Sequence, residues 1–127
     1  MKPTRGGAFK GVPPRLLYKF LPGSQLNNTD IIATINAMAA RAGHEGFFSQ
    51  QKAVFGRGDN RELLSTITCP TLVPCGRDDE MTPACLSREI ADQIPRVSLV
   101  MVEARRHLSP LEYPELTTGA LKEWSQR

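Results

Sequence analysis

The spacing of apolar residues predicts two amphipathic helices in the N-terminal half of the chain. Apolar side chains recur with a 3.6-residue period from position 31 to position 42, and Gly43 then marks the expected helix end. This stripe consists of Ile31, Ile32, Ile35, Met38, Ala39 and Ala42. A second helix is predicted from Glu45 to Phe55. Its expected buried side consists of Phe47, Phe48, Val54 and Phe55.

Shorter elements are expected on both sides of these helices. The stretch "PPRLLYKFL" predicts a short helix, because proline is tolerated in a first turn and Leu16, Leu17 and Phe20 share a face. Asn28, or one of the two residues after it, is expected to cap the first long helix. One further helical turn is expected over 61–66.

The pattern changes to β-structure after Pro70. "TLVPC" and "VSLVMVE" are short, nearly unbroken apolar runs, which is typical of strands buried on both faces. An amphipathic helix is predicted between them, with Thr82 as its N-cap and Pro83 at its first position. Apolar residues recur every four positions along this helix, at Leu86, Ile90 and Ile94.

A last helix is predicted to begin at Pro114. It is expected to bury Leu116, Ala120, Leu121 and Trp124. From Thr71 onward the order is strand, helix, strand, helix, which predicts a parallel βαβ unit with one extra covering helix. We therefore expect an α/β protein with a helical segment at 1–66 and a βαβα portion at 67–127.

Length, cysteines and hydropathy limit the class of protein. The 127 residues suffice for one modest domain. Cys69, Cys75 and Cys85 are odd in number and lack C-x-x-C spacing, which favours buried, reduced thiols in a cytoplasmic protein over disulfides or a zinc site. His44 and His107 lie outside helical or hairpin reach of them. No apolar run approaches the ~20 residues of a membrane span, and no secretory signal is evident. We expect neither a metal nor a cofactor.

The net charge of +3 is concentrated near the N-terminus. Before Asp30 there is no acidic residue, and the cations there are Lys2, Arg5, Lys10, Arg15 and Lys19. Such an arm can attract nucleic acid or anionic lipid. The cations are widely spread with few aromatics between them, which favours a solvated basic segment without a nucleic-acid partner.

Two residues capable of acid–base chemistry follow the two predicted strands. Asp79 comes just after the first strand and His107 just after the second. Parallel strands end at the same edge of a sheet, about 5 Å apart, so the two loops can meet. A carboxylate that accepts the Nδ1 proton of an imidazole forms the acid–base half of a catalytic triad. The alternative is that both residues serve only as caps.

The wording of these motifs favours the catalytic interpretation. The segment from "CPTLVPCGRDDEMTP" through "HLSPLEYPELTTGALKEW" resembles the C-terminal end of α/β-hydrolase-fold proteins, which cleave esters and lactones with a Ser…Asp…His order along the chain. "INAMAARAGHEGFFSQQKAVFGRGDN" resembles the helical lid of such enzymes. The resemblance extends from about Phe9 to the end. It implies that Asp79 is the triad acid, that His107 is the general base, and that the substrate is a small acyl ester or lactone.

The chain also departs from that family. No serine or cysteine lies in G-x-S-x-G, so we expect a C-terminal portion that is inactive alone. Pro74 interrupts the first strand, which predicts an edge or a bulge. Arg106 stands where the family usually has glycine; its charge disfavours a protonated His107 and its bulk can crowd the pocket. Asp78 and Glu80 are interpreted as solvated loop charges.

Three hypotheses for function remain open. The chain is a portion of an α/β-hydrolase, a non-catalytic module that completes another polypeptide, or a basic binding module that acts through its first residues.

A two-stranded parallel sheet is a poor free-standing core, so exposed apolar surface and self-association, or the need for a partner, are expected.

Overall fold

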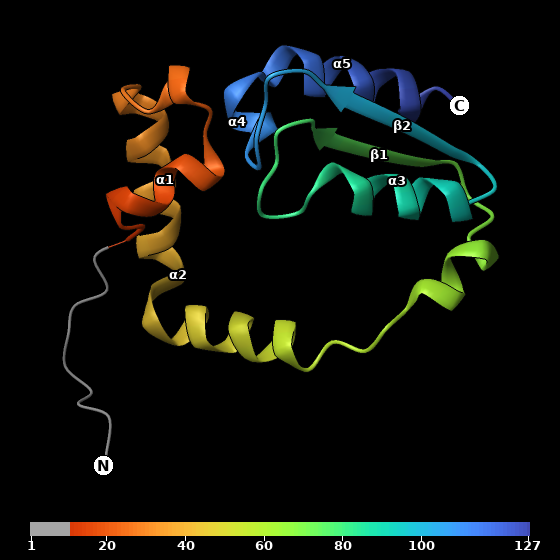
Figure 1. Ribbon diagram of the computed structural model, residues 1–127, viewed down its shortest axis with the longest axis horizontal. Coiled ribbons are helices and arrows are strands. Elements are labelled where there is room, and N and C mark those ends of the chain that lie inside the picture. Colours follow the sequence, from red (N-terminus) through yellow and green to blue (C-terminus); the bar gives the residue numbers. More distant parts are fainter. Residues whose placement is uncertain (1–10) are drawn as a thin grey trace.

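The computed structural model describes residues 11–127, in which helices precede a strand–helix–strand–helix unit (Figure 1). The first ten residues, which include part of the predicted basic arm and the expected start of the resemblance, lie outside the described residues. The helices and strands are α1 (Pro14–Phe20), α2 (Thr29–Phe55), β1 (Thr71–Gly76), α3 (Ala84–Gln93), β2 (Val97–Val102), α4 (Ser109–Glu112) and α5 (Pro114–Ser125). Short 3₁₀ turns occur at Gly23–Gln25 and Arg61–Thr66.

The long helix α2 consists of the two predicted helices joined at a bend. The Asn28 side chain caps it by accepting a hydrogen bond of 3.2 Å from the backbone N–H of Ile31, as predicted. Gly43 leaves helical geometry with φ 62° and ψ −174°. Glycine adopts this positive φ without steric cost, so the two halves of α2 diverge there (Figure 1).

A buried apolar cluster joins the helical segment to the C-terminal part of the chain. Leu17, Leu21 and Ile35 are buried together, and Leu108 and Leu111 pack against them. These last two residues lie one and four positions after His107 in the sequence. Burial of this cluster therefore fixes α1 and α2 against the turn that carries His107.

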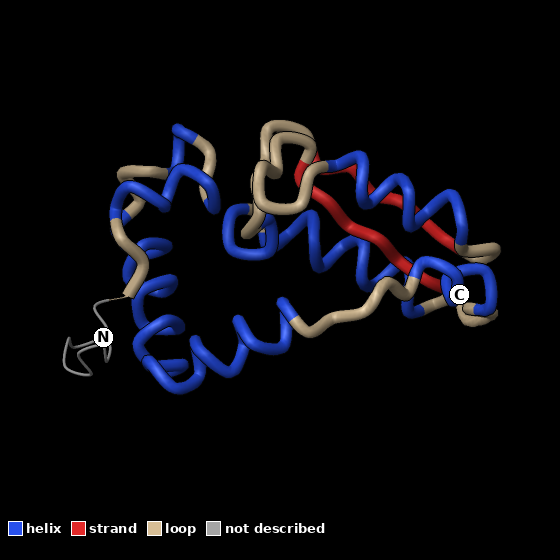
Figure 2. Tube along the Cα trace, turned by 60° about the horizontal axis from the view of Figure 1, so that its bottom comes forward, coloured by secondary structure: helices blue, strands red, loops and turns tan. Residues whose placement is uncertain are grey.

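The strands form the predicted parallel pair. β1 and β2 are in register from Thr71 opposite Val97 to Gly76 opposite Val102, and α3 and α5 flank them (Figures 1 and 2). The prediction of a parallel βαβ unit with a covering helix is confirmed. The chain thus has an α/β arrangement in which both strands end at the same edge of a two-stranded sheet.

Pro74 has no backbone N–H, but it lies at a position of β1 whose N–H would not pair with β2. The backbone N–H of Thr71 donates to Arg96 O at 2.8 Å and that of Arg77 to Val102 O at 3.0 Å. Backbone groups of a strand point alternately to its two sides, so the odd-numbered residues of β1 face β2 and Pro74 faces the open edge. The proline is exposed, as expected for an edge position.

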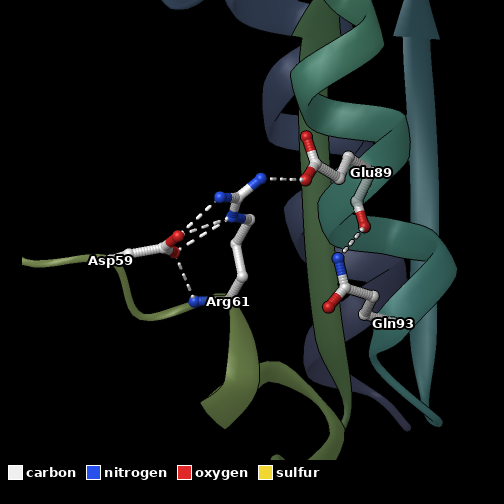
Figure 3. Close-up of polar contacts among 4 residues, drawn as sticks. All are labelled: Asp59, Arg61, Glu89 and Gln93. Atoms are coloured by element: carbon white, nitrogen blue, oxygen red, sulfur yellow. Dashed lines mark hydrogen bonds and ion pairs between the residues drawn. The ribbon is translucent and has the colours of Figure 1, made fainter.

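Polar contacts fasten the turn before β1 to helix α3 (Figure 3). The Arg61 guanidinium donates to Asp59 Oδ1 at 3.0 Å and to Glu89 Oε1 at 3.1 Å. Hydrogen bonds from Arg61 lower the pKa of Asp59 to about 2. Both ion pairs are exposed, so their contribution to stability is small.

Several predictions of burial are wrong. The predicted buried side of the second half of α2 is exposed, at 42% for Phe47 and 85% for Phe55. Further exposed apolar residues are Met38, Phe48, Val54, Leu86, Ile90, Leu116, Leu121 and Trp124. Most strand residues are only half buried, and Ala42 is exposed. Periodicity identifies the apolar side of an element, whereas burial also requires a second layer to cover it.

The cysteines also differ from expectation. All three are free, but only Cys75 is buried, because Cys69 precedes β1 and Cys85 lies on the open side of the first turn of α3. No group of three or more His, Cys, Asp or Glu side chains among residues 11–127 is placed to hold a metal ion. Within the same residues, no helix combines the length and hydropathy that crossing a membrane requires.

The exposed apolar surface predicts measurable association. We expect the chain to bind a hydrophobic dye and to elute from a sizing column ahead of a monomer. Phe55→Ser should weaken both effects while leaving the free energy of unfolding nearly unchanged, because Phe55 is 85% exposed. A compact monomer that binds no dye would contradict this prediction.

Candidate active site

The structure brings Asp79 and His107 into direct contact at the carboxyl ends of the two strands. The distance between His107 Nδ1 and Asp79 Oδ2 is 2.9 Å, although the residues are 28 positions apart. The Asp79 side chain is only 6% exposed and that of His107 is 32% exposed. The carboxyl group is therefore shielded, while the imidazole remains accessible.

Asp79 is held by its own turn. Its Oδ1 accepts hydrogen bonds from the backbone N–H groups of Met81 at 2.8 Å and Thr82 at 3.0 Å. Burial acts to raise the pKa of Asp79, but the hydrogen bonds from Thr82, His107 and Met81 outweigh it and the pKa is lowered. An ionised carboxylate only accepts hydrogen bonds, so in the neutral imidazole of His107 the proton lies on Nδ1 and the lone pair on Nε2.

Thr82 has a different role from the one predicted. Helix α3 begins at Ala84, with Pro83 at its N-cap and no side-chain cap. The Thr82 hydroxyl instead donates to Asp79 Oδ2 at 2.7 Å and lies 3.4 Å from His107 Nδ1. The Asp-x-x-Thr spacing is a signal for this arrangement, because an Asp side chain commonly accepts from backbone groups a few residues ahead.

The turn that carries His107 lies against Gly76. A Cβ atom on Gly76 would stand 2.4 Å from Arg106 O and 2.5 Å from Arg105 O, closer than any side chain tolerates. The backbone N–H of Asp78 donates to Arg105 O at 2.9 Å. Ala104 takes a positive φ of 52° at the start of the turn. Glycine at 76 therefore allows the two strand-end turns to touch.

Helix α1 holds the same turn from the other side. The backbone N–H of Leu108 donates to Phe20 O at 3.2 Å. The Phe20 ring meets the His107 ring edge-on, with 6.1 Å between ring centroids. These contacts place the end of α1 beside the imidazole.

Arg106 and Glu80 form a pair that the sequence did not predict. Arg106 Nη1 lies 2.7 Å from Glu80 Oε1 and also donates to Tyr18 O in α1. Glu80 is exposed, as expected for a solvated loop charge, and its carboxylate also binds the arginine that precedes His107. Asp78 is exposed, in line with its assignment.

Glu112 is a further buried acid near the site that the sequence did not reveal. It lies at the end of α4 and is 5% exposed. Burial raises its pKa, while the Arg106 backbone and the charges of Arg105 and Arg106 act in the opposite direction and the charge of Asp79 adds to the rise. The only sequence signal for a buried acid here is the spacing of five positions between His107 and Glu112.

An apolar cavity of about 460 Å³ lies in the helical segment. Its walls include Leu16 and Phe20 from α1 and Ala39 and Phe47 from α2. Phe20 thus borders both the cavity and His107. The volume is in the range of small-molecule sites.

Comparison with known proteins identifies the fold. No protein-family model matches the chain. A thermophilic esterase from Thermogutta terrifontis superposes with a TM-score of 0.81 at 30% identity, over 88% of this chain and 42% of the esterase. Est816, described as an N-acyl homoserine lactone degrading enzyme, gives 0.70 at 26% identity, over 87% and 45%. CarC, a serine hydrolase of carbazole degradation, gives 0.64 at 20% identity, over 89% and 46%, and supports the fold alone.

A curated relative points the same way. The (E)-2-((N-methylformamido)methylene)succinate hydrolase of Acinetobacter baylyi is 31% identical over 77 residues, which are 61% of this chain and 27% of that enzyme. The chain therefore spans about a quarter of this relative and less than half of the solved structures. Its fold is that of the C-terminal portion of an α/β-hydrolase. Within that class, it resembles esterases and lactone-degrading hydrolases.

Proposed function

We propose that this chain supplies the acid and the base of a carboxylic ester or lactone hydrolase. Asp79 acts as the triad acid and His107 as the general base. The observation that carries the proposal is the 2.9 Å contact between Asp79 Oδ2 and His107 Nδ1, made by an anchored carboxylate and an accessible imidazole. The likeness to esterases and a lactone-degrading enzyme supports the reaction class.

In this proposal, His107 and Asp79 together carry out the proton transfers of the acyl-transfer reaction. His107 Nε2 takes the proton of the nucleophile as it attacks the acyl carbon, and Asp79 stabilises the resulting imidazolium. The imidazolium then gives that proton to the leaving alkoxide. In the second half, His107 takes a proton from water, hydroxide attacks the acyl group, and the proton returns to the released nucleophile.

The nucleophile comes from outside these 127 residues in this proposal, because none of their serines or cysteines lies in G-x-S-x-G. The chain alone is then inactive. The exposed apolar side chains of α2, α3 and α5 and the open edge of β1 offer surface to a nucleophile-bearing segment. A second arrangement, in which that segment is a separate partner polypeptide, draws support from the same exposed surface.

The apolar cavity in the helical segment supports the proposed substrate class. Phe20 lines this cavity and also contacts the His107 ring, and the apolar walls suit the apolar part of an ester or an N-acyl lactone. A cytoplasmic location is part of the proposal, since three free thiols suit a reducing compartment.

A chimera tests the proposed function. The matched C-terminal portion of the Thermogutta terrifontis esterase is replaced by this chain, and hydrolysis of p-nitrophenyl butyrate and of an N-acyl homoserine lactone is measured. We expect no turnover by the chain alone, turnover by the chimera, and a loss of about 10⁶-fold in the kcat of the chimera with His107→Ala.

A mixing experiment distinguishes a single polypeptide from two separate polypeptides. Activity that returns when the chain is added to the separately expressed remainder of the esterase favours a partner polypeptide, whereas activity only in the fusion favours a single polypeptide. A folded chimera without turnover would refute the proposed roles, and so would ester turnover by the chain alone that survives His107→Ala.

A further inference from the structure

Glu112 is a buried acid whose oxygens have no hydrogen-bond partner among the described residues. Both Oε1 and Oε2 are unpaired, and so is the nearby buried donor Arg105 Nε. Buried polar atoms in native proteins are almost always paired, and a buried unpaired acid is costly. Packing alone does not account for a glutamate here, because an apolar side chain of the same size would fill this space at lower cost.

The surroundings of Glu112 belong to the turn that carries His107. The backbone N–H of Arg106 and the charges of Arg105 and Arg106 act on the carboxyl, although no donor reaches hydrogen-bonding geometry. The Arg105 guanidinium lies 4.0 Å above the ring of Tyr113, the residue after Glu112. The carboxyl group therefore lies close to residues 105 and 106, which directly precede His107 in the sequence.

Other contacts of the described residues also restrain this turn. Asp78 N–H binds Arg105 O, Gly76 limits the approach from β1, and α1 holds Leu108. Glu112 adds a buried carboxyl group close to residues 105 and 106.

We propose that Glu112 is a positioning residue for His107 in the reaction proposed above. After a small shift of the turn from its position in the structure, the buried carboxyl group accepts a hydrogen bond from the Arg106 N–H or from Arg105 Nε and so sets the distance between the imidazole and Asp79. The inference rests on the proposed function, but its test does not require turnover.

The test follows the Nδ1–H proton of His107 by NMR, because a hydrogen bond to a carboxylate moves this resonance far downfield. The resonance is assigned in the whole chain by its loss in His107→Ala. We expect Glu112→Gln, which retains one acceptor oxygen, to keep it. Glu112→Met and Glu112→Leu, which have similar volume and no acceptor, should lose it while thermal unfolding shows that they remain folded. Two apolar variants are made so that the test can still be carried out if only one of them folds.

Glu115→Met is the matched control, because Glu115 is exposed on α5 and only three residues away. It should leave the resonance unchanged. Persistence of the resonance in a folded Glu112→Met or Glu112→Leu chain overturns this inference alone, and so does its loss in Glu112→Gln. Its absence from the unsubstituted chain overturns the Asp79–His107 pairing itself, and the inference with it.

Discussion

Replacement of Asp79 by Asn is expected to lower the kcat of the chimera by about 10⁴-fold. The amide oxygen can still accept from the backbone N–H groups of Met81 and Thr82, so the turn keeps its shape. The amide no longer offers a carboxylate to His107 Nδ1, so the imidazole loses both its required tautomer and the charge that stabilises its protonated form. Steady-state kinetics with p-nitrophenyl butyrate measures the loss.

Asp78→Asn provides the matched control. Asp78 adjoins Asp79 and carries the same charge, but its side chain is exposed and its contact to the turn is made through its backbone N–H. The kcat of the chimera with Asp78→Asn should stay near that of the unsubstituted chimera. Equal losses in the two variants would show that the charge of the loop, rather than the contact with His107, matters.

The same pair of variants tests how Asp79 links stability to pH. The pKa of Asp79 in the folded chain lies below its ordinary value of 3.8. The ionised group therefore stabilises the native state fully above that ordinary value, and this stabilisation is lost as the pH falls through the lower, folded pKa. The free energy of unfolding should favour the unsubstituted chain over Asp79→Asn at neutral pH, and the difference should shrink in strong acid.

Replacement of Gly76 by Ala is expected to lower the free energy of unfolding by about 1–3 kcal/mol, the usual cost of forcing an extra methyl group into a filled space. The new Cβ would stand 2.4 Å and 2.5 Å from two backbone oxygens, which cannot turn aside as a flexible side chain would. The turn must move away from β1, and the Asp79–His107 contact should lengthen with it. Denaturant unfolding and the His107 Nδ1–H resonance measure the two effects.

Gly119→Ala is the control for this prediction. Gly119 lies within α5, and a Cβ atom there meets nothing within 4 Å. Alanine should raise the free energy of unfolding by about 0.5–1 kcal/mol, because glycine is the less favourable residue inside a helix. Similar effects of the two substitutions would contradict the proposed close contact between the two turns.

The parts of the fold that depend on local pattern could be predicted from the sequence. Apolar runs and helix signals predicted the parallel strands, a helix end at Gly43 and a cap at Asn28 or one of the two residues after it. The structure contains the strands, a bend at Gly43 and the cap at Asn28. Because parallel strands end at one edge, the same reasoning placed Asp79 beside His107. Their contact depends on topology and so needs no knowledge of side-chain packing.

The parts that depend on packing could not be predicted in this way. Phe55 was expected to be buried because it lies on an apolar helix face, and only the arrangement of the whole chain shows that this face is open. Thr82 had two possible partners, the helix end and Asp79, and the local sequence does not choose between them. Glu112 falls in a short polar stretch where its burial by α4 and the His107 turn leaves no periodic signal.

The alternation of backbone groups in the sheet gives its two open edges unequal propensities for aggregation. Arg96 O and Val102 O face β1, so the amides of Val97, Leu99 and Met101 all point away from it. The outer edge of β2 is therefore an uninterrupted template for fibril-like pairing with another chain. The outer edge of β1 is protected in its middle by Pro74, which cannot donate to an incoming strand.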